Sequence, residues 1–298
     1  MDLAASTLEH VIGSTPEEMR THYDGANDFF GVWLDPTMSY SSAMFEAGDS
    51  LEQAQIRKLD HHIANVHLRP GVRLLDIGCG WGAMMARAAE TVRDISATGI
   101  TIAEEQVRYI KARGIRGVDA MVAPWTEYEP SHRFDAIISV GAFEHFGRVG
   151  QPDNVRRQGY RHFFERCHEW LEPGGRFSLQ SVTFSNMPSE GQNAFIINDI
   201  FPASELPTLA DIAECSRGLF EIKALRNDRM DYAETNRRWL ANLRQNRAHA
   251  ESLVGKEKVE KYLDYLRYSI IGFHVGNTDL LRISMQRVDK PRFVPTFV

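Results

Sequence analysis

A short apolar segment that ends in alternating glycines constrains the fold of this 298-residue chain more than any other feature. From residue 74 to residue 82 it reads Leu-Leu-Asp-Ile-Gly-Cys-Gly-Trp-Gly. Glycines directly after a strand allow a tight turn and let the backbone approach a ligand, and a helix that follows offers free N–H groups. The spacing is GxGxG rather than the GxGxxG of dinucleotide binders, and no P-loop Gly-Lys-Ser/Thr is present. The segment therefore predicts a strand, a ligand-binding turn and a helix.

The segments around this turn alternate between expected strands and expected helices. Strands are expected at 72–76, 97–101, 120–122, 134–140 and 175–182, and helices at 50–67, 83–91, 104–112 and 160–171. The strand at 134–140 is apolar on both faces, as in a buried parallel strand. After residue 184 we expect helices at 209–216, 232–250 and 256–273 and a last strand at 280–287. This order predicts an α/β fold with an open, doubly wound, mostly parallel sheet, which binds ligands at the carboxyl ends of its strands.

We expect a single domain with four parts. Residues 1–50 form an aromatic-rich N-terminal cap, 51–184 the ligand-binding core, 185–277 helices on the substrate side, and 278–298 the final strand and a tail.

Composition and charge exclude several classes of protein. The chain holds 34 Lys and Arg against 40 Asp and Glu, a formal net charge of −6, so no nucleic acid partner is expected. Three scattered cysteines without CxxC spacing, Cys79, Cys167 and Cys215, indicate a reducing compartment and no structural zinc. No signal peptide or run of about 18 apolar residues is visible, so a cytoplasmic protein with at most peripheral membrane contact is expected. His61 and His62 lack further ligands at suitable spacing, and no metal site is expected.

Several motifs resemble those of known enzymes. Asp76 to Gly82 resembles motif I of class I S-adenosylmethionine-dependent methyltransferases, which share a Rossmann-like doubly wound sheet. Further segments resemble the cyclopropane fatty-acid synthase and mycolic-acid cyclopropane synthase family. They are Leu-Asp-Pro and Ser-Tyr-Ser at 34–41, Gly-Ile-Thr at 99–101, Phe-Glu-His-Phe-Gly at 143–147 and Ile-Phe-Pro at 200–202. The resemblance runs, with gaps, from about residue 22 to residue 286.

The resemblance implies an enzyme of lipid biosynthesis that transfers a methyl group from S-adenosylmethionine to an alkene carbon. The substrate cation then loses a proton, which gives a cyclopropane or a C-methylated product. The implied substrate is a hydrophobic alkene of lipid or isoprenoid type that is free, in a phospholipid or bound to a carrier. An N-terminal cap and inserted helices would cover the active site. An O- or N-methyltransferase on the same sheet and a catalytically silent cofactor-binding protein remain alternatives.

The resemblance also assigns the residues that contact the cofactor. They are Tyr40, Ser41, Asp76, Gly78, Gly80, Thr101, Gln106 and Trp125. The second strand lacks the acidic ribose ligand of many other methyltransferases, and the family shares this departure.

The implied chemistry places positive charge on the substrate, so the site should be dry, with π faces, a carboxylate and a proton acceptor. Glu144 follows the fourth strand, and Phe143, Phe146, Tyr40 and the weaker candidate Trp33 could supply aromatic walls. Relatives hold bicarbonate as the proton acceptor. The positions that correspond to its ligands are Glu144, Tyr232, Ser42, Gln180 and the main chain of Val140.

Two of these positions depart from the family. Ser42 replaces a Cys, and Gln180 replaces a His, which matters more because Gln cannot carry positive charge. Either bicarbonate is retained on Ser42, Gln180 and Tyr232, or Glu144, Tyr232 or a water accepts the proton directly.

An arginine-rich stretch follows the Phe-Glu-His-Phe-Gly motif. Arg148, Arg156, Arg157 and Arg161 either contact an anionic group of the substrate or belong to a solvated loop that leads into an amphipathic helix.

Overall fold

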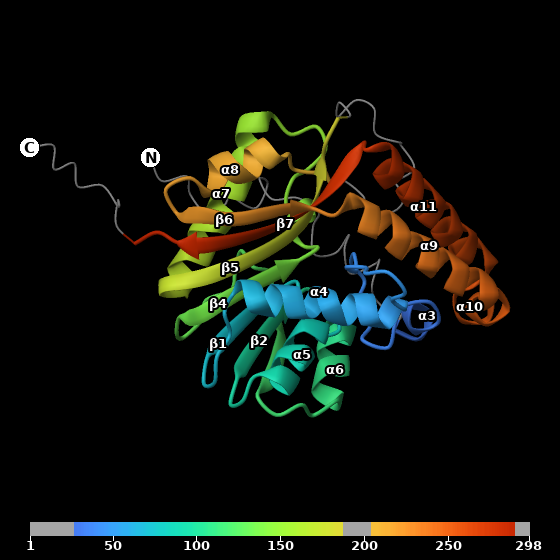
Figure 1. Cartoon of the computed structure of the whole chain (residues 1–298), viewed down its shortest axis with the longest axis horizontal. Coiled ribbons are helices and arrows are strands. Elements are labelled where there is room, and N and C mark those ends of the chain that lie inside the picture. Colours follow the sequence, from blue (N-terminus) through green and yellow to red (C-terminus); the bar gives the residue numbers. More distant parts are fainter. Residues whose placement is uncertain (1–26, 187–203, 290–298) are drawn as a thin grey trace, which may run out of the picture.

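The computed structural model describes residues 27–186 and 204–289, which form one seven-stranded sheet covered by helices (Figure 1). The strands are β1 (Arg73–Ile77), β2 (Ser96–Thr101), β3 (Val118–Val122), β4 (Phe134–Val140), β5 (Leu171–Phe184), β6 (Phe220–Asn227) and β7 (Thr278–Arg287). Their order is β3-β2-β1-β4-β5-β7-β6, and only β7 runs antiparallel to its neighbours. This confirms the doubly wound, mostly parallel sheet.

Helices cover both faces of the sheet. On one face lie α4 (Leu51–Asn65), α5 (Ala83–Thr91) and α6 (Glu104–Ala112), and on the other lie α7 (Asp153–Trp170) and α8 (Leu209–Ser216) (Figure 1). The aromatic rings of α7 pack on β4 and β5 in a large buried cluster that includes Phe163, Phe164 and Phe177. Burial of these rings from water holds this layer to the sheet.

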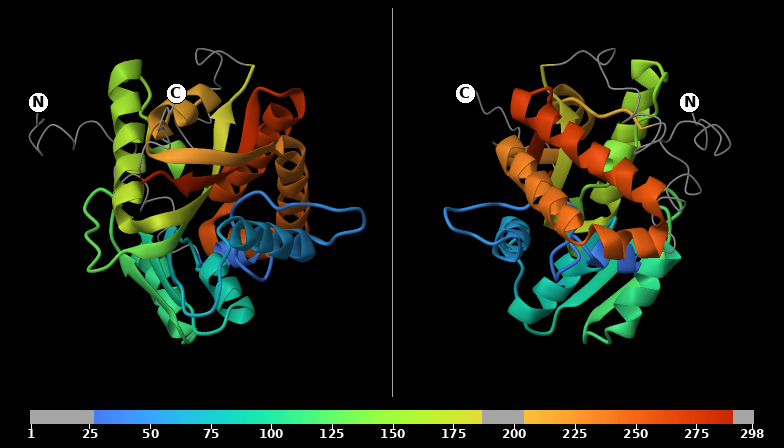
Figure 2. Two further views of the ribbon diagram at one scale, coloured as in Figure 1. Left: turned by 60° about the vertical axis from the view of Figure 1, so that its left-hand side comes forward. Right: turned by 90° about the vertical axis from the view of Figure 1, so that its right-hand side faces the viewer.

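Three further helices extend beyond the carboxyl ends of the parallel strands (Figures 1 and 2). They are α9 (Arg229–Gln245), α10 (Arg247–Val254) and α11 (Lys256–Val275), and the short α3 (Asn27–Gly31) packs on them. Phe29, Phe30 and Trp33 meet Trp239 and Tyr262 in a second buried cluster. Its ring centroids lie 5.0 to 6.0 Å apart, the spacing of attractive aromatic pairs. The described part of the N-terminal segment therefore covers the same sheet edge as α9–α11.

Helix α4 begins where the sequence predicts and carries an unexpected buried stripe. Ser50 and Gln53 form a reciprocal capping box at its start. The apolar Leu59 is buried, as are three polar side chains on the same side of the helix: Gln55, Lys58 and His62. Since residues three and four apart share a helix face, this stripe turns toward the sheet as one unit.

The second half of the chain differs from the sequence-based expectation. β6 is a strand where only helices were expected; it lies at the sheet edge, and its first residue, Phe220, is the one that is buried. The expected helix at 232–250 is two helices, α9 and α10, that meet at Asn246. Residues 1–26, the Ile-Phe-Pro motif at 200–202 and the tail from 290 lie outside the described residues.

Candidate active site

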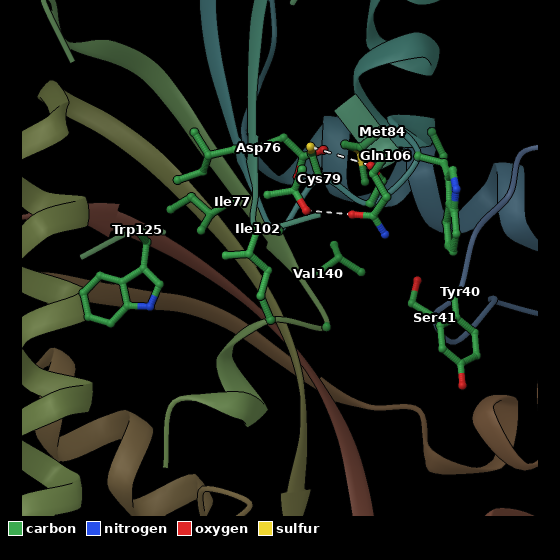
Figure 3. Close-up of a pocket in the computed structure, with 18 of the residues that line it drawn as sticks. Tyr40, Ser41, Asp76, Ile77, Cys79, Met84, Ile102, Gln106, Trp125 and Val140 are labelled. Carbon is green, nitrogen blue, oxygen red and sulfur yellow. Dashed lines mark hydrogen bonds between the residues drawn. The ribbon is translucent and has the colours of Figure 1, made fainter. Parts of the chain in front are cut away.

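A cavity of about 450 Å³ opens at the carboxyl ends of β1, β2 and β4 (Figure 3). Trp125 and Tyr40 stand at its opposite ends. All eight residues expected to contact a cofactor line it: Tyr40, Ser41, Asp76, Gly78, Gly80, Thr101, Gln106 and Trp125. Its volume is in the range of small-molecule and cofactor sites. The structure thus brings these residues together, and their contact with a cofactor stays a prediction.

The glycine turn after β1 forms the floor of this cavity and requires glycine at its first position. Gly78 has a φ of +75°, and a Cβ atom there would lie 2.6 Å from the Cβ of Ala142. The N–H groups of Gly78 and Cys79 both donate to the carbonyl oxygen of Ile100 at the end of β2. The turn therefore contacts the end of β2 and the segment after β4, and its remaining side lines the cavity.

Thr101 and Gln106 form one wall as a hydrogen-bonded pair. The Thr101 hydroxyl donates to Oε1 of Gln106 at 2.7 Å and accepts from the N–H of Ala103. With Oε1 occupied, the Gln106 amide nitrogen is left as a donor on the cavity side (Figure 3).

The cavity is also lined by a cation, Lys58, and a carboxylate, Asp76. Nζ of Lys58 donates to Oγ of Ser41 at 2.9 Å, and Gln55 donates to the carbonyl oxygen of Ser41 at 2.9 Å. Burial lowers the pKa of Lys58 to about 7 and raises the pKa of Asp76 to about 7. Sequence reasoning missed Lys58. The available signal was the polar stripe Gln55, Lys58 and His62 at helical spacing beside an apolar one.

Glu144 lies beside the cavity-lining Gly141, in the short 3₁₀ turn Phe143–His145, and is 8% exposed. Its Oε2 accepts from Oγ of Ser181 at 3.3 Å. A Cβ at Gly141, which lines the cavity, would lie 3.7 Å from Oε1 of Glu144 and 4.0 Å from Cβ of Ser41. Burial raises the pKa of Glu144 to about 7. A proton at this carboxyl can therefore be gained or lost near neutral pH.

Of the other expected catalytic positions, Val140 and Gln180 lie on neighbouring strands, Ser42 lies in the loop before α4, and Tyr232 lies on α9. Val140, Gln180 and Arg282 are direct cross-strand neighbours on β4, β5 and β7. Arg282 donates to Oε1 of Gln180 at 2.9 Å and to the carbonyl oxygen of Ser42 at 3.0 Å, so it joins these two positions. Tyr232 stacks on Phe273 with ring centroids 4.5 Å apart. Sequence reasoning missed Arg282.

The aromatic candidates divide between site and core. Tyr40 and Phe146 line the cavity, and Phe146 packs on Trp125 with centroids 5.0 Å apart. Phe143 is fully buried against Tyr160, Phe163 and Phe164, so it belongs to the α7 core rather than to the cavity wall. His145 lines the cavity, and burial lowers its pKa to about 4, which keeps it neutral.

The arginines after this motif are engaged with acidic side chains of the chain itself. Arg156 pairs with Glu205 and Asp153, Arg157 with Asp211 and Glu214, and Arg161 with Glu165. These ion pairs fasten α7 and favour, for these three residues, the second of the two alternatives, a segment that leads into an amphipathic helix.

Two features are absent from the described residues. Across 27–186 and 204–289, no three His, Cys, Asp or Glu side chains gather as metal ligands would. Within the same ranges, no helix has the length and apolar character of a membrane span.

Comparisons with known proteins agree with this geometry. The family model described as mycolic acid cyclopropane synthetase matches residues 13–283. Cyclopropane mycolic acid synthase 1 of Mycobacterium tuberculosis is 33% identical over 90% of this chain and 96% of its own length. The S-adenosylmethionine-dependent methyltransferase UmaA of the same species is 35% identical over 84% of this chain and 90% of its own length. The structure of mycolic acid cyclopropane synthase CmaA1 complexed with SAH and CTAB superposes with a TM-score of 0.83 at 32% identity, covering 92% of this chain and 99% of that one.

Proposed function

The chain belongs to the mycolic acid cyclopropane synthetase family, and on that premise we propose that it methylates an alkene carbon of a lipid or isoprenoid-like substrate. It is an S-adenosylmethionine-dependent methyltransferase with the class I fold. The finer proposal is that a substrate carbocation forms and loses a proton, which gives a cyclopropane or a C-methylated product.

The observation that supports alkene methylation most is the position of Glu144. A buried carboxyl group lies beside Gly141 at the edge of the cavity, burial and the charge of this group raise the pKa of Tyr265, and the ring of Tyr40 lines the same cavity. A buried carboxylate and π faces stabilise a cation, and their burial keeps out the water that would trap it. A methyl acceptor with a lone pair has no need of such a cage.

The cavity fits S-adenosylmethionine in size and in chemistry. Asp76 would receive its ammonium group, Lys58 and Ser41 its carboxylate, and Trp125 would lie against its base. Gly78 and Gly80 would let the backbone approach it, and Gln106 would donate from the side that Thr101 leaves open. When bound, the cofactor supplies the activated methyl group.

Glu144 is our first candidate for the proton acceptor. Its pKa near 7 lets the carboxylate form take a proton at neutral pH without binding it permanently. Bicarbonate held by Ser42, Gln180, Tyr232 and the main chain of Val140 is the second candidate. The buried charge of Arg282 behind Ser42 and Gln180 supports an anion there.

The first test is incubation of the enzyme with methyl-labelled S-adenosylmethionine and long-chain alkenes, followed by mass and NMR analysis of the product. We expect label on carbon, with the vinyl signal lost in a cyclopropane or moved in a methyl-alkene. Label on oxygen or nitrogen would contradict the proposal. The E144Q variant should bind cofactor and lose turnover, whereas E127Q, an exposed carboxylate at the other end of the cavity, should retain it.

The second test separates the two proton acceptors. If Glu144 accepts the proton directly, turnover in carbon dioxide-free buffer equals turnover with added bicarbonate. A rate that rises with bicarbonate and saturates would assign the proton to the bound anion.

A further inference from the structure

Arg282 is a fully buried cation on the strand next to the proposed active site. Its side chain is 0% exposed, and it stands in a row across the sheet: Val140, Gln180, Arg282 and Arg226. Paired residues of adjacent strands project from the same face of a sheet. The Gln180 side chain therefore lies between Val140, which lines the cavity, and Arg282.

The guanidinium fixes which way the Gln180 amide faces. Arginine has five N–H donors and no acceptor, so the Gln180 atom that receives Nε at 2.9 Å must be the oxygen Oε1. Oε1 is therefore committed to Arg282, and Nε2 is the amide donor that is left for another partner. Among the described residues Nε2 has no hydrogen-bond partner.

His62 reinforces this orientation from α4. Its Nε2 lies 3.2 Å from the same Gln180 oxygen, so the ring must carry its proton there. Nδ1 then accepts from Oγ of Ser178 at 2.8 Å. Burial lowers the pKa of His62 well below its usual value, so the ring is neutral and this tautomer is complete.

The remaining donors of Arg282 hold two other segments. One arm pairs with Asp228, which also binds Arg226, and the other donates to the carbonyl oxygens of Ser42 and Ala43 at 3.0 and 2.9 Å. Arg226 is half exposed, so water screens its charge. Gln180 is itself neutral, but Arg282 places a positive charge in direct hydrogen-bond contact with its side chain.

We propose that Arg282 is a positioning residue of the active site, which holds Gln180 so that its Nε2 group donates to a negatively charged oxygen beside Val140. The inference rests on the proposed function, since that oxygen belongs to Glu144 or to the bound anion. Because Oε1 already accepts from Arg282 and His62, the Gln180 side chain would then meet that oxygen only as a hydrogen-bond donor.

The Gln180→Glu variant tests the proposal with the least disturbance. It keeps the shape and the contacts to Arg282 and His62, replaces the Nε2 donor by an oxygen, and adds a negative charge beside Arg282 that would repel the oxygen that Nε2 serves. We expect kcat to fall ~10- to 100-fold, the scale for losing a hydrogen bond to a charged group, with KM for S-adenosylmethionine unchanged. An unchanged kcat in folded Q180E would overturn the proposal.

Arg282→Met should lower kcat in the same way, and Arg282→Lys should restore part of it. Arg226→Met is the matched control: it removes the neighbouring arginine on Asp228 and should leave kcat as in the wild type. If R282M does not fold, Q180E carries the decision alone.

A second measurement needs no turnover. In ¹⁵N NMR spectra, His62 of the wild type should show the Nε2–H tautomer between pH 6 and pH 8, and in R282M the released amide should give a mixture of tautomers. One unaltered tautomer in R282M would refute the positioning role. A wild type that transfers no methyl group to alkenes refutes the proposed function instead, and the two failures are thereby distinguishable.

Discussion

Lys58 is an ammonium group with 2% of its surface exposed, held on α4 between the fields of Asp35 and Asp76. Removing a charge from water is costly, and its lowered pKa reflects that cost. A buried ammonium group needs an anionic or polar partner that compensates for the lost water. Here the bond from Nζ to Ser41 places the ammonium on the cavity wall, where the carboxylate of an amino acid would complete its solvation.

We therefore predict that Lys58→Met weakens S-adenosylmethionine binding ~10- to 100-fold, the value of a hydrogen bond to a charged group. Isothermal titration calorimetry measures the Kd. Arg57→Met is the control, because Arg57 is on the same helix but pairs with Asp49 and Glu46 at the surface. Equal affinities of K58M and the wild type would exclude Lys58 as a ligand.

The residue types of the cavity were largely predictable, because its glycines, Asp76 and Trp125 belong to short motifs beside expected strands. Lys58 and Arg282 were not predictable in this way. The sequence does not distinguish a buried cation from an exposed one. Lys58 and Arg282 are buried because α4 packs on the sheet and β7 lies inside it. Phe143 shows the reverse error, because its motif predicts a site residue while its ring packs in the α7 core.

At the scale of elements, the turn between β1 and α5 sets the floor of the site. Its first glycine adopts a left-handed φ and lies against Ala142 in the turn after β4. The turns after β1 and β4 thus approach more closely than a side chain at position 78 would allow, and both turns line the cavity.

Gly78→Ala should destabilise the protein and abolish cofactor binding. Gly174→Ala should destabilise the protein less and leave cofactor binding unchanged. Both glycines have a φ of +75°, but a Cβ at Gly174 meets nothing within 4 Å. The left-handed backbone common to both costs an alanine about 1 to 2 kcal/mol, and the Ala142 clash adds about 1 to 3 kcal/mol at Gly78 alone. Urea unfolding and calorimetry measure the two effects. A G78A variant no less stable than G174A would contradict this account.

The elements of the first half follow the sequence closely, and α5 and α6 begin and end where their periodicity predicts. The second half follows it less well for a physical reason. β6 is an edge strand with one buried residue, so it has no apolar alternation to recognise. The break at Asn246 lies in a segment that is helical on both sides, and no Pro or Gly marks it.

At the scale of the whole molecule, α9–α11 and α3 close the sheet edge over groups that are costly to ionise. Burial raises the pKa of both Glu144 and Asp76, and it lowers that of Lys58. The fold therefore responds to pH through its active site.

Glu144 gives this response a definite sign. Its folded-state pKa is raised from 4.5 to about 7, so the folded state binds the proton more tightly than the unfolded state. Its contribution to stability is complete below about pH 4.5 and is lost as the pH rises to about 7. The free energy of unfolding of the wild type relative to E144Q should fall by up to about 3 kcal/mol over this window.

Denaturant unfolding of both proteins at several pH values measures this difference. The comparison removes the contribution of Asp76, which has the same sign, and that of Lys58, which acts in the opposite direction above about pH 7. A difference that does not vary with pH would mean that Glu144 is ionised normally.

The bond between Gln180 and Arg282 also restricts how such an arrangement can arise by descent. A histidine at position 180 would place an imidazole ring next to the Arg282 guanidinium. A neutral residue at position 282 would remove the donor that holds the Gln180 amide. Either substitution alone would thus give a protein in which this contact is lost, because contacting side chains are energetically coupled. In a lineage that carries this gene, we expect the two codons to be replaced together or not at all.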